Sequence, residues 1–208
     1  MAIVKHTEQR VGVFIDTQNL YHSAKNIYHA RVNFGNVLKD AVAGRHLIRA
    51  RAYMVTTESG EETAFLEALT KVGIEPKTKD LQIFYGGAKK ADWDVGMAVD
   101  AITASPKLDA VILITGDGDF IPLVEYLQNM GVQTEVMAFR ETSSSKLVEA
   151  ADDFVDLSRD QGRYLIATRH TGRANNASTG RQARGPKSAP TADDVDPNIS
   201  QMLKDDQE

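Results

Sequence analysis

The hydrophobic and polar positions of this chain follow two alternating rhythms, one typical of buried strands and the other of helices. Two unbroken apolar runs, residues 11–15 and 111–114, have the length of strands covered on both faces of a parallel sheet. Other segments predict further strands over residues 47–55, 77–84, 132–138 and 154–157. Apolar side chains three or four positions apart predict helices over residues 20–28, 34–42, 94–103 and 122–131.

Two local signals add helices and complete the alternation. Ser59 and Glu62 have the spacing of a capping box, and apolar positions at helical spacing follow before Gly73. A short helix is expected from Ser144. Because strands and helices alternate along the chain, we predict an α/β protein with a three-layer fold and a mainly parallel central sheet.

The composition is that of an ordinary globular protein. Of the 208 residues, 42% are hydrophobic and 25% are charged, which is enough apolar material for one good core. The chain contains no cysteine, so neither disulfides nor thiolate zinc sites can form. No apolar stretch approaches the roughly 20 residues of a membrane span, and the start lacks a signal-peptide pattern, which predicts a cytoplasmic protein.

The character of the chain changes near Asp160. The formal net charge of -5 gives no overall attraction to nucleic acid, so a polyanionic substrate would need a local basic surface. Residues 161–208 are poor in apolar side chains and carry arginines first and carboxylates afterwards. We therefore predict a folded domain over residues 1–160 and a largely disordered tail over residues 161–208. The tail arginines would act either as an RNA-gathering arm or as part of a plain linker.

Carboxylates follow both of the unbroken apolar runs. Asp16 comes directly after the first run, and Asp117 and Asp119 follow the second. Open parallel sheets place their sites at the carboxyl ends of strands, so these side chains converge if the two strands are neighbours. Clustered carboxylates raise one another's pKa unless a cation lies between them, and such oxygen ligands suit Mg²⁺ or Mn²⁺. The pattern therefore predicts a divalent metal site.

Four ordered motifs carry a resemblance to a known family. They span residues 14–20 (FIDTQNL), 90–100 (KADWDVGMAVD), 115–123 (TGDGDFIPL) and 151–154 (ADDF). Together they resemble the NYN domain of the PIN-like nuclease superfamily, in its LabA-like branch. The resemblance covers roughly residues 11–158 and implies a Rossmann-like PIN fold with a metal-dependent ribonuclease site.

The resemblance also implies roles for individual residues. The family pattern falls on Asp16, Asn19, Asp94, Asp117 and Asp119. Phosphodiester hydrolysis needs an acidified water and neutralisation of transition-state charge, both of which bound metal supplies. Asp16, Asp94 and Asp117 are assigned as metal ligands. Asp119 is assigned as a further ligand or as the base that orients water. Asn19 would hold a water molecule or a phosphate oxygen.

Three further residues are candidates for substrate binding. Thr115 would steady a carboxylate, Trp93 would stack a nucleobase, and Lys90 would approach a phosphate. Packing is the alternative for the tryptophan, because its large ring usually contributes buried area. Asp100 lies off the helix face that Asp94 occupies, which favours a structural role or the support of a metal ligand from behind.

Ordinary structural roles compete with the acidic site. Asp16, Asn19 and Asp119 each precede or begin a predicted helix, where such side chains often act as caps. Asp117 has the weakest claim to a structural role, because an unpaired carboxylate at the end of a buried strand is costly.

The sequence is compatible with three functions from different classes. The leading one is a metal-dependent ribonuclease that hydrolyses RNA phosphodiester bonds. A non-catalytic RNA-binding or regulatory module is the alternative, and either reading leaves open a homo-oligomer. A haloacid dehalogenase-like phosphatase is disfavoured, because Gln18 stands where that chemistry needs an acid to protonate the leaving group.

Overall fold

The computed structural model describes residues 3–56, 62–80, 82–83, 89–90 and 93–167. A six-stranded sheet forms the centre of the molecule, in the order β4-β3-β1-β7-β8-β9. Every neighbouring pair in this sheet is parallel. The strands are β1 (Arg10–Asp16), β3 (His46–Thr56), β4 (Glu75–Asp80), β7 (Ala110–Ile114), β8 (Gln133–Ala138) and β9 (Asp153–Asp156).

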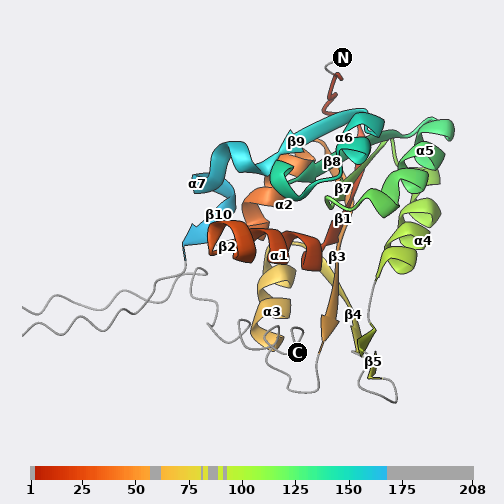
Figure 1. The fold of residues 1–208 in the computed structure, drawn as a ribbon. Coiled ribbons are helices and arrows are strands. Elements are labelled where there is room, and N and C mark those ends of the chain that lie inside the picture. Colours follow the sequence, from red (N-terminus) through yellow and green to blue (C-terminus); the bar gives the residue numbers. More distant parts are fainter. Residues whose placement is uncertain (1–2, 57–61, 81, 84–88, 91–92, 168–208) are drawn as a thin grey trace, which may run out of the picture.

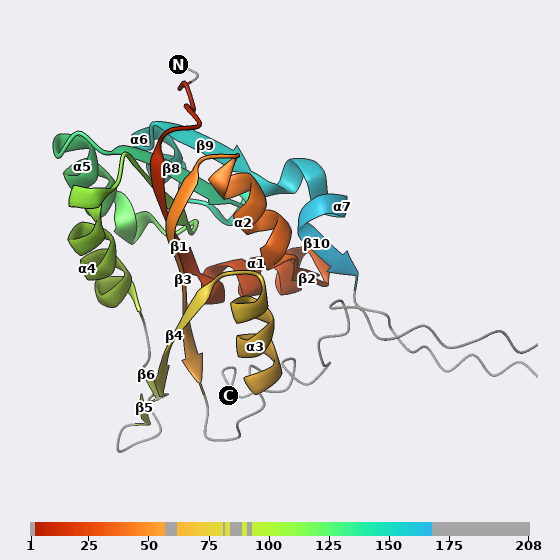
Figure 2. The same ribbon diagram turned by 180° about the vertical axis from the view of Figure 1, so that it is seen from behind.

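Helices cover both faces of this sheet. They are α1 (Thr17–Tyr28), α2 (Phe34–Val42), α3 (Thr63–Lys71), α4 (Asp94–Ala104), α5 (Ile121–Asn129), α6 (Ser145–Ala150) and α7 (Gln161–Tyr164). Figures 1 and 2 show α1, α2 and α3 on one side of the sheet and α4 and α5 on the other. The predicted three-layer α/β fold with a mainly parallel sheet is therefore confirmed.

Two small sheets accompany the main one. The short strands β2 (Ala30–Val32) and β10 (Leu165–Ala167) pair in antiparallel fashion, as do β5 (Gln82–Ile83) and β6 (Lys89–Lys90). The strand predicted over residues 77–84 is divided, because β4 ends at Asp80 and the remainder belongs to β5 or lies outside the described residues.

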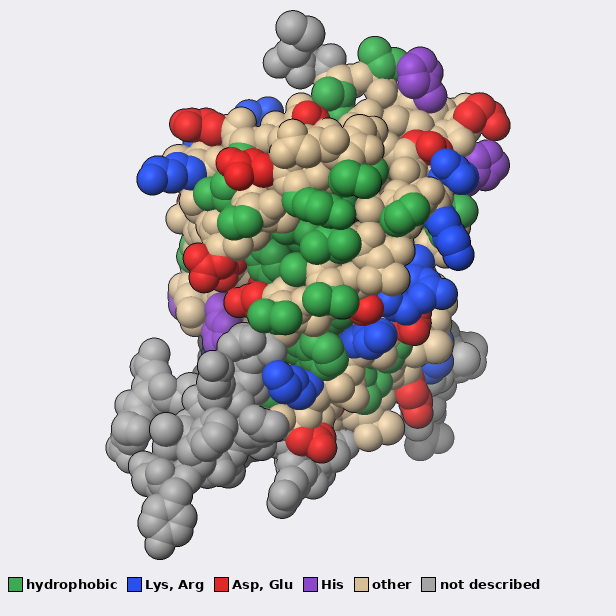
Figure 3. Space-filling model, turned by 90° about the vertical axis from the view of Figure 1, so that its right-hand side faces the viewer, with side chains coloured by type: hydrophobic (Ala, Val, Ile, Leu, Met, Phe, Trp, Pro, Cys, Tyr) green, Lys and Arg blue, Asp and Glu red, His purple; other side chains and the backbone are tan. Residues whose placement is uncertain are grey.

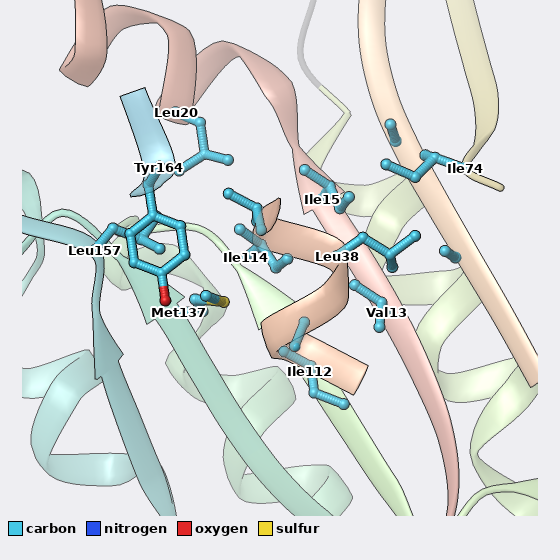
Figure 4. Packing of buried hydrophobic residues seen from close by; sticks show 14 of the residues in the cluster. Val13, Ile15, Leu20, Leu38, Ile74, Ile112, Ile114, Met137, Leu157 and Tyr164 are labelled. Carbon is cyan, nitrogen blue, oxygen red and sulfur yellow. The ribbon is translucent and has the colours of Figure 1, made fainter. Parts of the chain in front are cut away.

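The two central strands alternate their side chains between two hydrophobic cores. Val13 and Ile15 of β1 face the core under α1 and α2, and Ile112 and Ile114 of β7 lie beside them (Figure 4). Phe14 points to the opposite core under α4 and α5. All five side chains are essentially inaccessible to solvent. Because both faces are covered, every position of these strands must be apolar, which explains the unbroken runs in the sequence.

The strand order changes direction between β1 and β7. From β1 the chain moves outward through β3 and β4, and then returns to place β7 on the other side of β1. Ligands of open α/β sheets bind at such a reversal point, outside the carboxyl ends of the strands. The fold therefore brings together the two strand ends that carry Asp16 and Asp117.

Two helix starts differ from the sequence predictions by more than one residue or in their capping. The first helix begins at Thr17, earlier than expected, because the Asp16 side chain accepts a hydrogen bond from the backbone N–H of Asn19. Glu62 is the N-cap residue of α3 and makes no side-chain capping bond, so the predicted capping box is wrong in its register. Its proposed partner, Ser59, lies outside the described residues.

The folded part extends past the predicted boundary at Asp160. Tyr164 of α7 is buried, its carbonyl accepts from the Asn33 N–H (2.8 Å), and its hydroxyl donates to Asp40 (2.7 Å). Arg163 forms an ion pair with the same carboxylate. Residues 161–167 therefore belong to the domain, whereas residues 168–208, with most of the predicted tail, lie outside the described residues. None of the helices within the described ranges is long and apolar enough to cross a membrane.

Candidate functional site

Asp16 stands at the junction between β1 and α1, where it faces two other segments. One carboxylate oxygen, Oδ1, accepts from the Asn19 N–H (3.0 Å) and so caps α1. The other oxygen, Oδ2, accepts from the hydroxyl of Thr115 (3.2 Å), which follows β7. This second contact crosses from one strand end to the next and ties the two predicted site segments together.

The loop after β7 holds the second carboxylate in place. The backbone N–H of Asp117 donates to the Thr115 Oγ1 (3.2 Å), so one buried hydroxyl touches both the Asp16 side chain and the Asp117 backbone. Asp117 Oδ1 accepts from the Asp119 N–H (2.9 Å) and caps the short 3₁₀ turn 118–120. The expectation that Asp117 had the weakest structural role is therefore wrong, because this carboxylate also acts as a cap.

Asn19 joins the same two segments from the other side. Its Oδ1 accepts from the backbone N–H of Gly116 (2.9 Å). This bond and the Thr115–Asp16 bond fasten the start of α1 to the loop after β7. The amide oxygen of Asn19 is therefore committed to the backbone, which leaves its amide nitrogen for the predicted contact with a water molecule or a phosphate oxygen.

Burial makes the charged form of Asp16 costly. Loss of solvent raises the pKa of this carboxyl, and the nearby charge of Asp117 raises the pKa further. Hydrogen bonds from Asn19 and Thr115 act in the opposite direction but do not cancel the effect. A cation beside the two carboxylates would relieve both causes at once. The electrostatics at the β1 and β7 ends thus favour a positively charged ligand.

The other two predicted ligands line a neighbouring hollow between α4 and α5. Asp94 is the first residue of α4, and Asp119 lies just before α5. Both side chains line a hollow of about 410 Å³, together with Val95, Ala98, Ile102, Phe120, Pro122, Leu123 and Tyr126. The four predicted carboxylates therefore fall into two linked pairs, because the Asp119 N–H contacts Asp117.

The donor chemistry of the first pair fits a hydrated hard cation. Within the described residues, no group of three or more His, Cys, Asp or Glu side chains is arranged to hold a metal ion. Mg²⁺, however, usually keeps several waters and is bound through one or two carboxylates plus substrate phosphates. Asp16 and Asp117 supply two such carboxylates beside the carboxyl ends of the neighbouring strands β1 and β7. The residues present therefore suit an open, water-rich site rather than a closed protein cage.

A third segment, after β8, packs against the site through hydroxyl residues that the sequence analysis did not assign to it. The Ser144 N–H donates to the Gly116 carbonyl (2.9 Å), and the hydroxyls of Thr142 and Ser23 lie 2.7 Å apart. A Cβ on Gly116 would lie 3.0 Å from both the Ser143 Oγ and the Thr142 carbonyl. Glycine is needed here because the two loops touch. The run of four hydroxyl residues at 142–145 was the available signal.

Trp93 has the packing role that was the alternative in the sequence. Its indole N–H donates to the Met54 carbonyl (2.8 Å), and its ring lies 5.5 Å from the ring of Tyr53. The Lys79 ammonium lies 5.9 Å from the tryptophan ring. Lys90 is the other predicted substrate-binding residue. Its backbone forms part of β6, and its side chain is not among those that the structure describes. Thr115 is fully buried, so its contact is with Asp16 and not with a substrate.

Several other acidic residues support the fold. Asp100 accepts from the Tyr53 hydroxyl (2.8 Å) and pairs with Arg51 (3.0 Å), as a structural role predicts. Burial opposes its ionisation, but these partners hold the pKa of Asp100 below its usual value. Asp152, from the fourth motif, accepts from the Thr134 N–H (2.7 Å) at the start of β8, away from the site. Phe120, and not Asp119, is the N-cap residue of α5.

Comparison with known proteins places the chain in a family. The NYN domain model matches residues 10–158. The low amplitude and bright protein LabA of Synechococcus elongatus is 24% identical over 160 residues, a match covering 71% of this chain and 83% of LabA. An uncharacterised protein of Methanocaldococcus jannaschii is 25% identical over 155 residues, covering 74% of this chain but only 57% of that protein.

A solved structure has the same fold. The crystal structure of a Vibrio parahaemolyticus protein of unknown function is similar with a TM-score of 0.71 at 29% identity, covering 79% of this chain and 100% of that one. The family match includes all three strand and helix ends that carry Asp16, Asp94 and Asp117. The sequence resemblance is thereby confirmed, and the chain belongs to the NYN domain family of the PIN-like nuclease superfamily.

Proposed function

We propose that this protein is a divalent-metal-dependent ribonuclease that hydrolyses phosphodiester bonds of RNA. NYN domains generally act on RNA, and PIN-like nucleases generally use divalent metal ions. The observation that carries the proposal is the Asp16–Thr115–Asp117 connection between the ends of β1 and β7, where burial and a second carboxylate raise the pKa of Asp16. Mg²⁺ or Mn²⁺ is the ion that these oxygen donors suit.

In this proposal the residues divide between holding and positioning. Asp16 and Asp117 hold the ion, with Asp94 and Asp119 contributing from the adjoining hollow. When bound, the ion would acidify water and offset charge on the phosphate in the transition state. Thr115 keeps the two carboxylates in register through its hydroxyl, and Asn19 holds the loop after β7 against α1.

Asp119 is suited to orient the attacking water. Its side chain is exposed, in contrast to the half-buried Asp16 and Asp117. A carboxylate beside a phosphate-binding site can accept a proton from water and aim the remaining oxygen. The same exposure lets a polymer reach this side chain from solvent, as an RNA strand must.

The test is cleavage of a fluorescent single-stranded RNA with Mn²⁺ or Mg²⁺ by the full chain and by Asp117→Asn. The amide keeps the size of the carboxylate, so the fold survives while the charge is lost. We expect at least a roughly 100-fold loss of rate, in line with losing a metal ligand. Asp109→Asn is the matched control, because this carboxylate pairs with Arg10 beside the opposite ends of the strands.

Equal cleavage by the wild type and Asp117→Asn would point to a contaminating nuclease and would overturn the proposal. Metal binding is followed separately by calorimetry on the same proteins, without RNA. We expect weaker Mn²⁺ binding by Asp117→Asn and unchanged binding by Asp109→Asn. This second readout tests the ion site even if the RNA chosen is a poor substrate.

A non-catalytic RNA-binding module is the second candidate, and one observation favours it. Asp16 and Asp117 are both engaged as helix or turn caps, and no three-carboxylate cluster is formed by the described residues. Such a module would bind the RNA with the same affinity in the wild type and in Asp117→Asn, without cleavage. Metal-dependent cleavage that is lost in Asp117→Asn would exclude it.

A further inference from the structure

The hollow between α4 and α5 has an acidic end and an apolar remainder. Asp94 and Asp119 lie at the end where the two helices begin. Ala98 and Ile102 follow on α4 at helical spacing, and Tyr126 follows on α5, so each helix contributes a stripe of side chains. Because a helix rises 1.5 Å per residue, the stripe of α4 extends about 12 Å from its first residue. The hollow therefore leads away from the proposed ion site along the two helices.

Apolar side chains stay accessible along this hollow. Ile102 and Tyr126 are 36% and 42% exposed, and Val95 at the acidic end is 74% exposed. Figure 3 shows this face of the molecule, with hydrophobic side chains gathered across its middle. The volume of about 410 Å³ falls within the roughly 300–1,000 Å³ of small-molecule sites. Aromatic and aliphatic side chains around a few polar groups are also the usual lining of such sites.

We propose that this hollow receives an unpaired nucleobase of an RNA strand whose phosphate lies at the ion site. The inference rests on the RNA substrate of the proposed function and adds the form of RNA that the site accepts. The hollow adjoins the ion site, because the backbone N–H of Asp119 donates to Asp117. A nucleotide with its phosphate at the acidic end extends its base along the hollow towards Tyr126.

The charges of the hollow favour a base over a phosphate. Among the described residues, its lining has two carboxylates and no lysine or arginine. These carboxylates repel a phosphate unless an ion lies between them, and deeper in the hollow no charged group of the described lining would offset the phosphate. Arg51 and Lys77 pair instead with Asp100, whose carboxylate does not line the hollow. The base is the uncharged part of a nucleotide, and its faces suit the apolar walls.

Tyr126 is the residue suited to stack on the base. Aromatic rings bind single-stranded RNA by stacking on base faces, and every base has such a face, so this recognition tolerates many sequences. It requires, however, that the base is unstacked and free to turn away from its neighbours, as in single strands and loops. We therefore expect the site to accept single strands and loops and to reject duplexes.

The test is equilibrium binding of fluorescent probes to the full chain, followed by anisotropy. The probes are a short oligouridine, an abasic ribose-phosphate oligomer of the same length and charge, and an RNA duplex. Ca²⁺ is present as a hard cation that takes oxygen ligands, and a gel shows that the probes remain intact. We expect the oligouridine to bind roughly 10-fold or more tightly than the abasic oligomer, and the duplex to bind no better than the abasic oligomer.

Variants then locate the base. Tyr126→Ala should lose most of the difference between oligouridine and abasic oligomer, and Tyr126→Phe, which keeps the ring, should recover it. Val99→Ala and Met130→Ala are the matched controls, because these side chains are 54% and 58% exposed on the same two helices but do not line the hollow. We expect both controls to bind the probes like the wild type.

Three results would overturn the proposal. The first is equal affinity of the wild type for oligouridine and abasic oligomer, or binding of neither, and this result does not depend on how any variant folds. The second is the same affinity for oligouridine in Tyr126→Ala and Met130→Ala. The third is a wild type that sediments as a dimer which Tyr126→Ala dissociates, because a second copy would then occupy the hollow.

Failure of this inference can be told apart from failure of the proposed ribonuclease. If Asp117→Asn abolishes metal-dependent cleavage while Tyr126→Ala binds oligouridine like the wild type, the ribonuclease stands and the base site is wrong. If no metal-dependent cleavage is found but binding of oligouridine depends on Tyr126, the base site stands in a non-catalytic RNA-binding module.

Discussion

Gly96 offers a sharp test of how α4 is seated against the sheet. It occupies the first turn of α4, where a Cβ would lie 2.6 Å from Cε3 and 2.9 Å from Cζ3 of Trp93. The tryptophan ring cannot easily withdraw, because its N–H is bonded to the Met54 carbonyl and its ring packs against Tyr53. Gly96→Ala therefore forces the indole and the adjoining helix start apart.

The expected effect is the difference between two opposing terms. Replacing glycine by alanine inside a helix stabilises by about 1 kcal/mol. Overpacking a rigid contact of this kind costs about 1–3 kcal/mol. We therefore expect a net loss of about 1 kcal/mol in the free energy of unfolding, or a melting temperature lower by roughly 2–4 °C for a domain of this size.

Gly35 provides the matched control. It also lies in the first turn of a helix, α2, and its nearest atom to an added Cβ is the Asn33 Oδ1 at 3.5 Å. No contact opposes the gain in helix propensity, so Gly35→Ala should stabilise by up to about 1 kcal/mol. The same chemical change is thus expected to have opposite signs in α2 and α4.

The measurement is urea denaturation of both variants, followed by intrinsic fluorescence. Trp93 is the only tryptophan, so its emission also reports directly on the displaced ring. We expect a shifted emission maximum in folded Gly96→Ala and an unchanged one in Gly35→Ala. If Gly96→Ala is as stable as Gly35→Ala and its emission is unaltered, the described seating of α4 on Trp93 is wrong.

Three further predictions concern the frame around the site. Hydrogen bonds from Arg10 lower the pKa of Asp109 to about 2, so this carboxylate stabilises the fold above pH 4 and loses that effect between pH 3.8 and 2. In Asp109→Asn, the free energy of unfolding should therefore fall less steeply as the pH is lowered through this range, and an unchanged slope would contradict this. Arg45→Met leaves the buried Glu135 with one partner fewer, so the free energy of unfolding measured in urea should fall by about 3 kcal/mol. Adding Glu135→Met should recover most of this loss, and equal stability of the single and double variants would refute the reasoning. Tyr164→Ala should lower the free energy of unfolding by about 3 kcal/mol, measured by calorimetry. Unchanged stability would mean that α7 does not unfold cooperatively with the rest of the domain.

Much of the sheet could be predicted because its signals are local. Strands β1 and β7 are covered on both faces, so their sequences are unbroken apolar runs that cannot be mistaken for surface segments. Helix α2 was predicted with its observed bounds, since its apolar spacing is regular and Asn33 caps it. Strands β2 and β10 were not predicted, because three-residue strands acquire their hydrogen bonds only from each other across the chain.

The site was predicted in its residue types but not in its connections. Asp16 and Asp117 stand at strand ends, which the apolar runs reveal. The hydroxyl of Thr115 joins residues 99 positions apart, and no local pattern signals such a bond. The same holds for the contact of Gly116 with the loop after β8, and for the extension of the domain to Tyr164 through Asp40.

The sequence by itself determined the α/β class, the two central strands, the family and the acidic residues at the strand ends, because periodicity and short motifs are written along the chain. Only the tertiary structure decided that β1 and β7 are neighbours, that Asp16 is buried enough for its pKa to rise, and that Asp94 and Asp119 share a separate hollow. The physical reason is that the burial of a carboxylate, the pairing of strands and the exposure of a helix face all depend on which segments pack together. Packing is a property of distant residues in contact, and no window of the sequence contains both partners.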